Sequence, residues 1–153
     1  MTVELVGTAE RMLQTQRFPA VYAHVQRFYA HQMRSLDAQD TEHWAGTFTE
    51  DAVFELPALP GPVRGRAGLD HYVRAGAARR RRAGGSCHHW IGMLDVQPQA
   101  DGSLHTRCSA LVHAAPSGGG PKVLYVCVME DVLVRVHDEW RVAHRRVTRD
   151  DLA

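Results

Sequence analysis

The chain has 153 residues, with 18 Lys or Arg against 17 Asp or Glu, so its formal net charge is +1. This balance excludes a global field that would draw the protein to nucleic acid or to an anionic membrane. The length suits one domain with its own core, and we treat residues 1–153 as that domain. No apolar run could span a bilayer and no secretory signal opens the sequence, so we expect a cytoplasmic protein.

The first half of the sequence predicts helices. Apolar residues recur at three- and four-residue steps over Phe18–Leu36, which is typical of an amphipathic helix whose start lies as early as Thr8. Asp40 is a suitable N-cap for a short second helix. This second helix is expected over Thr41–Phe48. It is followed by a strand over Asp51–Glu55 and a third helix over Ala67–Arg82.

The third helix ends in the only basic block of the sequence, Arg79 to Arg82. Cations at the C-terminal end of a helix complement its dipole, and Gly84-Gly85 then stops the helix. We interpret the block as a helix end. A phosphate or nucleic-acid patch is the alternative, but no interleaved aromatic residues accompany the block.

The second half predicts strands, because β-branched and aromatic residues dominate and turn signals separate the runs. The expected strands are His88–Gln97, Leu104–Ala115, Val123–His137 and Trp140–Thr148. Cys87, Cys108 and Cys127 lie on or beside them, without a CxxC pair, and are expected to be reduced thiols. The fold class is therefore α+β, with about three helices on one face of a curved antiparallel sheet. Such a cone would enclose one small apolar ligand.

Four polar residues interrupt apolar stretches and are candidates for chemistry: Asp37, His89, His113 and Glu130. Each has a structural explanation as well, since Asp37 could satisfy backbone donors at a helix junction and Glu130 could mark a β-bulge or a sheet edge. Two histidines on neighbouring strands, with one carboxylate able to orient an imidazole, form a minimal general acid and base set.

Several segments resemble one known superfamily. The run Leu36-Asp37-Ala38-Gln39-Asp40, the run from Phe48 to Phe54, and Trp140-Arg141-Val142 followed by Arg145 are similar to the SnoaL-like superfamily. Its members include polyketide cyclases and share a cone fold with ketosteroid isomerase and nuclear transport factors. The resemblance implies this fold for our chain.

Within that superfamily, the functional match is to scytalone dehydratase. His89-Trp90-Ile91-Gly92 and Val112-His113 resemble the segments around its two histidines, and Asp37 stands where its aspartate would. The dehydratase has pocket tyrosines where this chain has Leu36 and approximately Leu56, and an asparagine near Glu130, so a different substrate is implied.

The resemblance implies a cofactor-independent lyase or isomerase that dehydrates or cyclises a small aromatic or polyketide-like metabolite by acid-base catalysis. His89 would abstract the proton, and Asp37 would hold His113, which would donate one. The expected substrate contacts are Glu130, which would orient a hydroxyl, and Phe54 and Trp90, which would offer flat apolar surfaces.

Other functions stay open at this point. A non-catalytic small-molecule-binding or accessory protein is one, for example a chain resembling the β subunit of a ring-hydroxylating dioxygenase. A metal site is another, suggested by His88, His89, His105 and His113, although their spacing matches no compact ligand pattern. We expect no metal, no cofactor and no nucleic acid or membrane partner. A sheet covered on one face only favours a homodimer or homotrimer.

Overall fold

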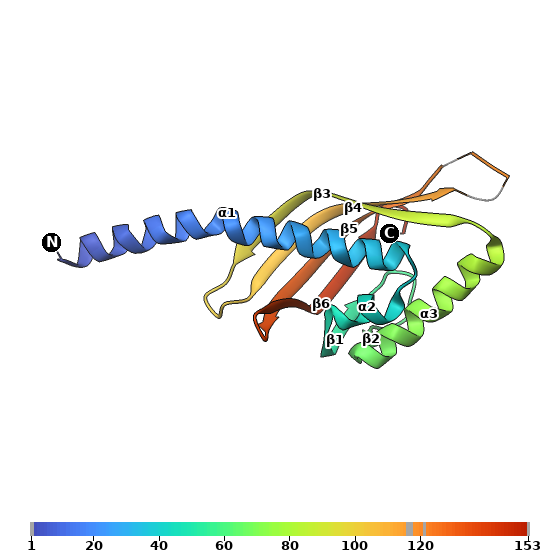
Figure 1. Ribbon diagram of the computed structural model, residues 1–153, viewed down its shortest axis with the longest axis horizontal. Coiled ribbons are helices and arrows are strands. Elements are labelled where there is room, and N and C mark those ends of the chain that lie inside the picture. Colours follow the sequence, from blue (N-terminus) through green and yellow to red (C-terminus); the bar gives the residue numbers. More distant parts are fainter. Residues whose placement is uncertain (1, 116–117, 121, 153) are drawn as a thin grey trace.

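The computed structural model describes the backbone of residues 2–115, 118–120 and 122–152, and the side chains of these ranges from residue 17 onward. Three helices lie on one side of a single curved sheet (Figure 1). In chain order the elements are α1 Thr2–Asp37, α2 Thr41–Gly46, β1 Phe48–Glu55, β2 Val63–Arg64, α3 Gly65–Ala83, β3 Ser86–Pro98, β4 Leu104–Ala115, β5 Lys122–Val136 and β6 Glu139–Arg149.

The first two helices form in the predicted regions, but α1 begins at Thr2, before Thr8, and α2 ends at Gly46 rather than at Phe48. α1 buries Val25, Tyr29 and Met33, which share one helical face. Its N-terminal part projects beyond the sheet, as the blue ribbon of Figure 1 shows. Asp40 caps α2, because its carboxylate accepts the backbone N–H of His43 at 3.2 Å. This contact therefore fixes where α2 begins.

α3 ends as predicted at Gly84, which has a φ of 71° and lies in the left-handed region that favours glycine. Its buried residues are Leu69, Val73 and Ala77, again at three- and four-residue steps. The first glycine of the helix, Gly65, also has a positive φ of 75°. It follows the two-residue strand β2, which the sequence does not predict because Pro60, Gly61 and Pro62 lie directly before it.

The sheet has six strands in the order β2-β1-β6-β5-β4-β3. The four long strands form the expected antiparallel meander, and β1 pairs in parallel with β6. β3 is an edge strand that α1 crosses (Figure 1). A register shift between Gly92 and Asp95, where Met93 has a φ of 53°, marks a β-bulge in β3. Such bulges bend a sheet, which supports the curvature expected from the sequence.

The core lies between the helices and the inner face of the sheet. Trp44, Phe48 and Phe54 pack against one another with ring centroids 4.6 to 6.2 Å apart. Val25 and Leu69 from the helices and Leu133 and Val142 from the strands are fully buried around them. Among the helices of the described residues, none is long and apolar enough to cross a membrane.

Candidate functional site

A groove of about 1000 Å³ runs between α1 and the edge strand β3. Its helical wall comes from one face of α1, which repeats at three- and four-residue steps, and its other wall comes from β3 with a contribution from β4. The α1 residues that line it include Tyr22, Tyr29, Met33, Arg34 and Asp37, and the strand residues include His89, Trp90, Ile91, Leu94 and His113. The groove is mostly apolar, with its titratable groups near the end of α1.

Asp37 and His89 form a hydrogen-bonded pair in this groove. The Nδ1 atom of His89 lies 2.7 Å from Oδ1 of Asp37, and the backbone N–H of His89 donates to both carboxylate oxygens at 3.1 and 3.2 Å. Both side chains are largely buried. Because an ionised carboxylate can only accept, Nδ1 carries a proton in this contact. In the neutral imidazole Nε2 is then the atom with the free lone pair.

The structure brings Asp37 to His89 rather than to His113. In the antiparallel pair of β3 and β4, His88 is opposite His113 and His89 is opposite Val112. Side chains alternate between the two faces of a strand, so His113 shares the face of His88, not that of His89. His113 borders the groove, but the predicted contact between Asp37 and His113 does not occur. His88 lies 3.7 Å from Asp37 and is largely exposed.

Trp90 lies on the rim of the groove. Its side chain is 70% exposed, and Met93 beside it is 88% exposed. Both positions line the groove. By strand alternation Trp90 takes the face of His88 and His113, opposite to that of His89. The bulge at Met93 brings the carbonyl of Leu94 to the hydroxyl of Tyr22, which donates to it at 3.1 Å. This bond ties the middle of α1 to the edge strand.

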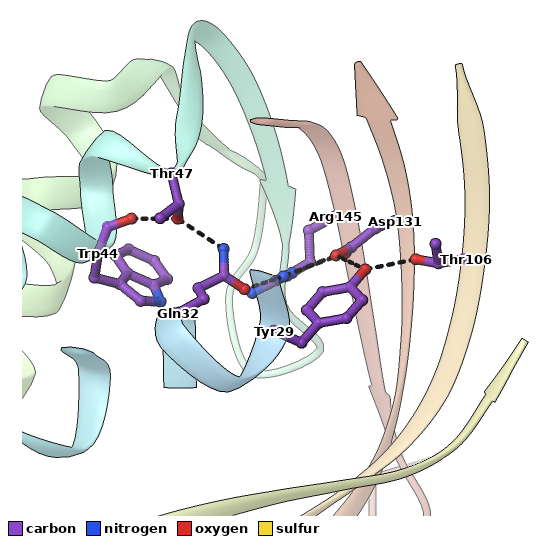
Figure 2. Close-up of polar contacts among 7 residues, drawn as sticks. All are labelled: Tyr29, Gln32, Trp44, Thr47, Thr106, Asp131 and Arg145. Atoms are coloured by element: carbon purple, nitrogen blue, oxygen red, sulfur yellow. Dashed lines mark hydrogen bonds and ion pairs between the residues drawn. The ribbon is translucent and has the colours of Figure 1, made fainter. Parts of the chain in front are cut away.

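A buried polar network lies at the inner wall, next to Tyr29 (Figure 2). Arg145 donates to both oxygens of Asp131 at 2.8 and 2.7 Å, and the hydroxyl of Tyr29 donates to Asp131 at 2.7 Å. Thr106 lies 2.6 Å from the same hydroxyl and, since that proton is used, donates to it. Every member of this set is buried.

The network continues from Arg145 toward α2. Arg145 donates to Oε1 of Gln32 at 2.7 Å, Gln32 donates to the Thr47 hydroxyl at 2.7 Å, and that hydroxyl donates to the carbonyl of Trp44 (Figure 2). It therefore connects α1, the segment after α2, and three strands. The carboxylate of Asp131 and the hydroxyls of Tyr29 and Thr47 thus have protein partners, and the network serves to position α1 over the sheet.

The electrostatics of this network hold its protons in place. Burial raises the pKa of Tyr29 well above its usual value, and the charge of Asp131 raises it further. Burial opposes the charge on Arg145, but Asp131 outweighs it and the pKa of the guanidinium lies above its usual value. Tyr29 therefore stays a phenol and Arg145 a cation, so neither is suited to exchange a proton near neutral pH.

Two predicted substrate contacts are not in the groove. Glu130 accepts hydrogen bonds from Arg107 at 2.9 Å and from Arg146 at 3.2 Å. Because its neighbour Asp131 points into the core, alternation puts Glu130 on the outer face of the sheet. Phe54 is buried in the aromatic core. The guanidinium carbon of Arg145 lies 5.2 Å from the ring centroid of Phe48 and 6.0 Å from that of Phe54. Its role is packing.

Sequence reasoning also missed residues. Tyr29 and Gln32 both lie on the buried face of α1. Of the two, only Gln32 is recognisable in the sequence as a polar residue on an otherwise apolar face. Asp131, beside the predicted Glu130, is the acidic residue that is buried, and a one-residue difference in strand phase decides between them. Within the described part of the chain, no group of three or more His, Cys, Asp or Glu could hold a metal ion.

Solved structures resemble this chain closely. Aln2 from a Streptomyces species is 34% identical, with a TM-score of 0.81, and the match covers 88% of this chain and 94% of Aln2. A protein from Catenulispora acidiphila in complex with S-DNPA is 32% identical, with a TM-score of 0.75 and coverage of 87% and 96%.

A third structure shows the fold alone. It is an NTF2-like protein with a cystatin-like fold from Novosphingobium aromaticivorans, 20% identical, with a TM-score of 0.76 and coverage of 97% of this chain and 92% of that one. This likeness confirms the α+β cone predicted from the sequence. No curated protein matches the chain significantly. The model of the SnoaL-like domain matches residues 20–146, and the chain therefore belongs to the SnoaL-like domain family.

Proposed function

We propose that the protein is a cofactor-independent enzyme that dehydrates or cyclises a small aromatic, polyketide-like metabolite by acid-base catalysis. The single observation that carries the proposal is the pair of Asp37 and His89 in an apolar groove. The family supports a cyclase or dehydratase reaction in general.

His89 acts as the base in this proposal. With Nδ1 bonded to Asp37, its Nε2 can accept a proton from an activated carbon and return it to a leaving hydroxyl or an enolate. Asp37 orients the ring and stabilises the imidazolium that forms, as a carboxylate partner does in other acid-base pairs. A single imidazole that first accepts a proton and then donates it is sufficient for this reaction. The proposal therefore requires no second histidine bonded to Asp37.

The groove favours a flat and largely apolar substrate. Tyr22 and Met33 on α1 and Ile91 and Leu94 on β3 provide apolar contacts along its length, and Trp90 lies at the rim. Apolar walls with few polar groups are typical of pockets that bind small organic ligands. The structural relative from Catenulispora acidiphila contains a small molecule, S-DNPA, which is consistent with small-molecule binding in this family.

Turnover of a substrate panel tests the proposal. The panel holds aromatic β-hydroxy ketones and poly-β-ketones, and loss of water or ring closure is followed by absorbance and mass spectrometry. We expect wild-type turnover, and a loss of about a hundred- to ten-thousandfold in His89→Gln and in Asp37→Asn. His105→Gln is the matched control, because His105 lies in a different, charged hollow on the outer face.

Three outcomes decide the assignment. Folded His89→Gln and Asp37→Asn variants with near-normal turnover would disprove the role of the pair. His113→Gln, assayed in parallel, should keep most activity; a loss as large as that of His89→Gln would restore the proton-donor role that the sequence predicts for His113. Tight binding of panel compounds by the wild type, without any turnover, would favour the non-catalytic binding protein instead.

Self-association is a separate proposal. Among the described residues, no helix covers the outer face of the sheet (Figure 1). Separately, Val123, Leu124 and Val126 on β5 are large apolar residues that are at least 40% exposed. Exposed apolar area of this kind is often buried between subunits. We expect a homodimer or homotrimer. Sedimentation equilibrium of the purified chain measures this directly, and a monomer at all concentrations would contradict it.

A further inference from the structure

The groove wall on the side of β3 is formed by the backbone edge of that strand. Every residue from 88 to 94 lines the groove, including Gly92, which has no side chain. Because side chains alternate between the two faces of a strand, a wall made of side chains would include only every second residue. β3 is an edge strand, so no further strand bonds the backbone groups on its open side. The groove therefore runs along these backbone groups.

α1 caps this open edge at two points. The carboxylate of Asp37 accepts the backbone N–H of His89, and the hydroxyl of Tyr22 donates to the backbone carbonyl of Leu94. Among the described residues, no side chain bonds the backbone of residues 90–93, which lie between the two caps. The middle of the edge is therefore open to a ligand in the groove.

Ile91 presents its backbone N–H to this open stretch. In an antiparallel pair, the backbone groups of alternate residues point to the same side, and the register between β3 and β4 is unbroken over residues 86–92. The N–H of His89 points away from β4 and toward α1, so the N–H of Ile91, two residues further, does the same. The opposite residue agrees, because the carbonyl of Ala110 accepts from the thiol of Cys127 on β5 and not from β3.

This donor lies next to the proposed base. Ile91 and His89 are two residues apart on one strand, which separates equivalent atoms by about 6.6 Å, and their side chains share one face. A carbonyl group with its neighbouring carbon fits between a donor and a base at this spacing. Across the groove, Ala30 and Met33 of α1 have no N–H or O–H group in their side chains that would compete for the oxygen.

We propose that the backbone N–H of Ile91 is a subsite for the carbonyl oxygen of the ligand, and that the ligand is a ketone with an acidic carbon beside that carbonyl. The inference rests on the proposed function, because it takes His89 as the base that meets this carbon. The subsite is uncharged and lies on the groove itself. It therefore needs neither a counterion nor a second cavity.

The subsite acts on the oxygen that gains charge in the reaction. Nε2 of His89 takes the proton from the acidic carbon, and the electron pair of that C–H bond moves to the carbonyl oxygen, which gives an enolate. The N–H of Ile91 donates to this oxygen, and a donor already aimed at developing charge lowers the barrier. The imidazolium formed at the same time balances the new negative charge.

The second half of the reaction returns the proton. In a dehydration, the enolate re-forms the ketone with a new C=C bond, and the β-hydroxyl takes the proton from His89 and leaves as water. In a ring closure, the enolate carbon attacks a second carbonyl group, whose oxygen takes the same proton. Both routes keep the first carbonyl oxygen at the N–H of Ile91.

The subsite can be observed directly, because Ile91 is the only isoleucine of the chain. Labelling with nitrogen-15 isoleucine gives one backbone cross-peak in the proton–nitrogen NMR spectrum. The probe is 2-acetylnaphthalene, and the control ligand is 2-isopropenylnaphthalene, in which a CH₂ group replaces the carbonyl oxygen. We expect the ketone to move the Ile91 amide proton downfield, as a new hydrogen bond does, and the hydrocarbon to leave it without this shift.

An ester in place of one peptide bond tests the same donor in catalysis. Incorporation of the α-hydroxy acid analogue of isoleucine at position 91 replaces the N–H by oxygen and keeps the side chain. We expect kcat on the substrate found in the panel to fall about a hundred- to thousandfold, with a smaller change in KM, since the charge develops only in the transition state. The matched control is the valine α-hydroxy acid at Val96, which makes the same change on β3 at a residue that does not line the groove.

Three results would overturn the inference. These are a ketone that fails to bind or binds without moving the Ile91 proton, an equal shift with the hydrocarbon, and an ester at position 91 that lowers kcat no more than the ester at Val96. Circular dichroism confirms that both ester variants are folded. The NMR measurement needs no turnover, so His89→Gln should keep the downfield shift.

The two proposals fail separately. A ketone-induced downfield shift in a protein that turns over no member of the panel would refute the proposed function alone. An active enzyme whose ester variant at position 91 keeps its kcat would refute the subsite alone.

Discussion

Arg145 and Asp131 face each other from neighbouring strands and form a two-pronged ion pair in which the side chains are 2% and 0% exposed. Two charges removed from water cost several kcal/mol each, and their attraction offsets this only when the remaining donors and acceptors are also bonded. Tyr29 and Gln32 supply these bonds from α1. The pair therefore both requires and fixes the position of α1, which forms one wall of the groove.

Removing one partner of this pair should destabilise the protein strongly. Arg145→Met leaves Asp131 buried with a charge that only neutral donors contact, and we expect a loss of about 3 to 5 kcal/mol in the free energy of unfolding. Arg146→Met is the control, since Arg146 binds Glu130 at the surface and should contribute less than about 1 kcal/mol. Urea unfolding followed by circular dichroism measures both. Similar losses in the two variants would contradict the burial argument.

Alkaline pH should destabilise the fold through its buried thiols. Burial raises the pKa of Cys108 to about 12, with a further contribution from Asp131. Above the unfolded value near 9, the unfolded chain loses this proton while the folded chain keeps it, so stability is full below pH 9 and falls as pH rises toward 12. The slope from one such group is about 1.4 kcal/mol per pH unit.

Cys108→Ala should reduce this slope. Its unfolding free energy at pH 8 will be lower because of the lost packing, but the additional decrease between pH 8 and 10.5 should be smaller than in the wild type. The measurement is urea unfolding under reducing conditions at the two pH values. Tyr29 and Cys127, whose pKa values are also raised by burial, keep a residual slope in the variant. An identical slope in both proteins would show that Cys108 ionises as readily in the fold as outside it.

The fold could be predicted because its signals are local. The three-residue spacing in α1, the Asp40 cap and the stop at Gly84 each depend on a few adjacent residues, and each element appears where the sequence predicts it. The first strand begins at Phe48, at the residue assigned to the end of the second helix, because α2 stops at Gly46. Element boundaries of this kind depend on tertiary packing, which local patterns do not contain.

The site could be predicted only in part, because it depends on strand phase. The sequence places Asp37 after a helix and His89 at the start of a strand, but it does not say which face each strand residue takes. A shift of one residue moves a side chain to the other face of a sheet. This phase puts His89 inward and His113 outward, and Asp131 inward with Glu130 outward. The bulges in β3 and β5 make the phase hard to extrapolate along either strand.

Gly65 should be intolerant of a side chain. Its φ is +75°, and a Cβ built there would lie 3.3 Å from the carbonyl oxygen of Glu50. We expect Gly65→Ala to cost about 2 kcal/mol, from left-handed backbone strain and from the shift of the strand that Glu50 belongs to. Gly102→Ala has the same strain at φ +85° but open space, so it should cost about 1 kcal/mol. Thermal unfolding of both variants measures the difference in stability. Equal losses of stability would mean that β1 moves away from the added Cβ without an energetic cost.

The proton position on His89 is the sharpest prediction about the reactive pair. Since the carboxylate of Asp37 can only accept, Nδ1 of a neutral His89 should carry the proton and Nε2 the lone pair. Asp37→Asn replaces one oxygen by an NH₂ group that can donate to Nδ1, so the variant should shift the ring toward the opposite tautomer while keeping its position. Nitrogen-15 NMR of labelled histidine at pH 8 distinguishes the tautomers directly.

Asp40→Asn is the control for this substitution, because it makes the same chemical change three residues away and Asn is an equally good helix N-cap. It should leave both the tautomer of His89 and the activity unchanged. Because a base needs its lone pair directed at the substrate, the loss of activity in Asp37→Asn should follow the shift in tautomer population. If Asp37→Asn kept the wild-type tautomer and still lost activity, Asp37 would act through its negative charge and not by orienting the ring.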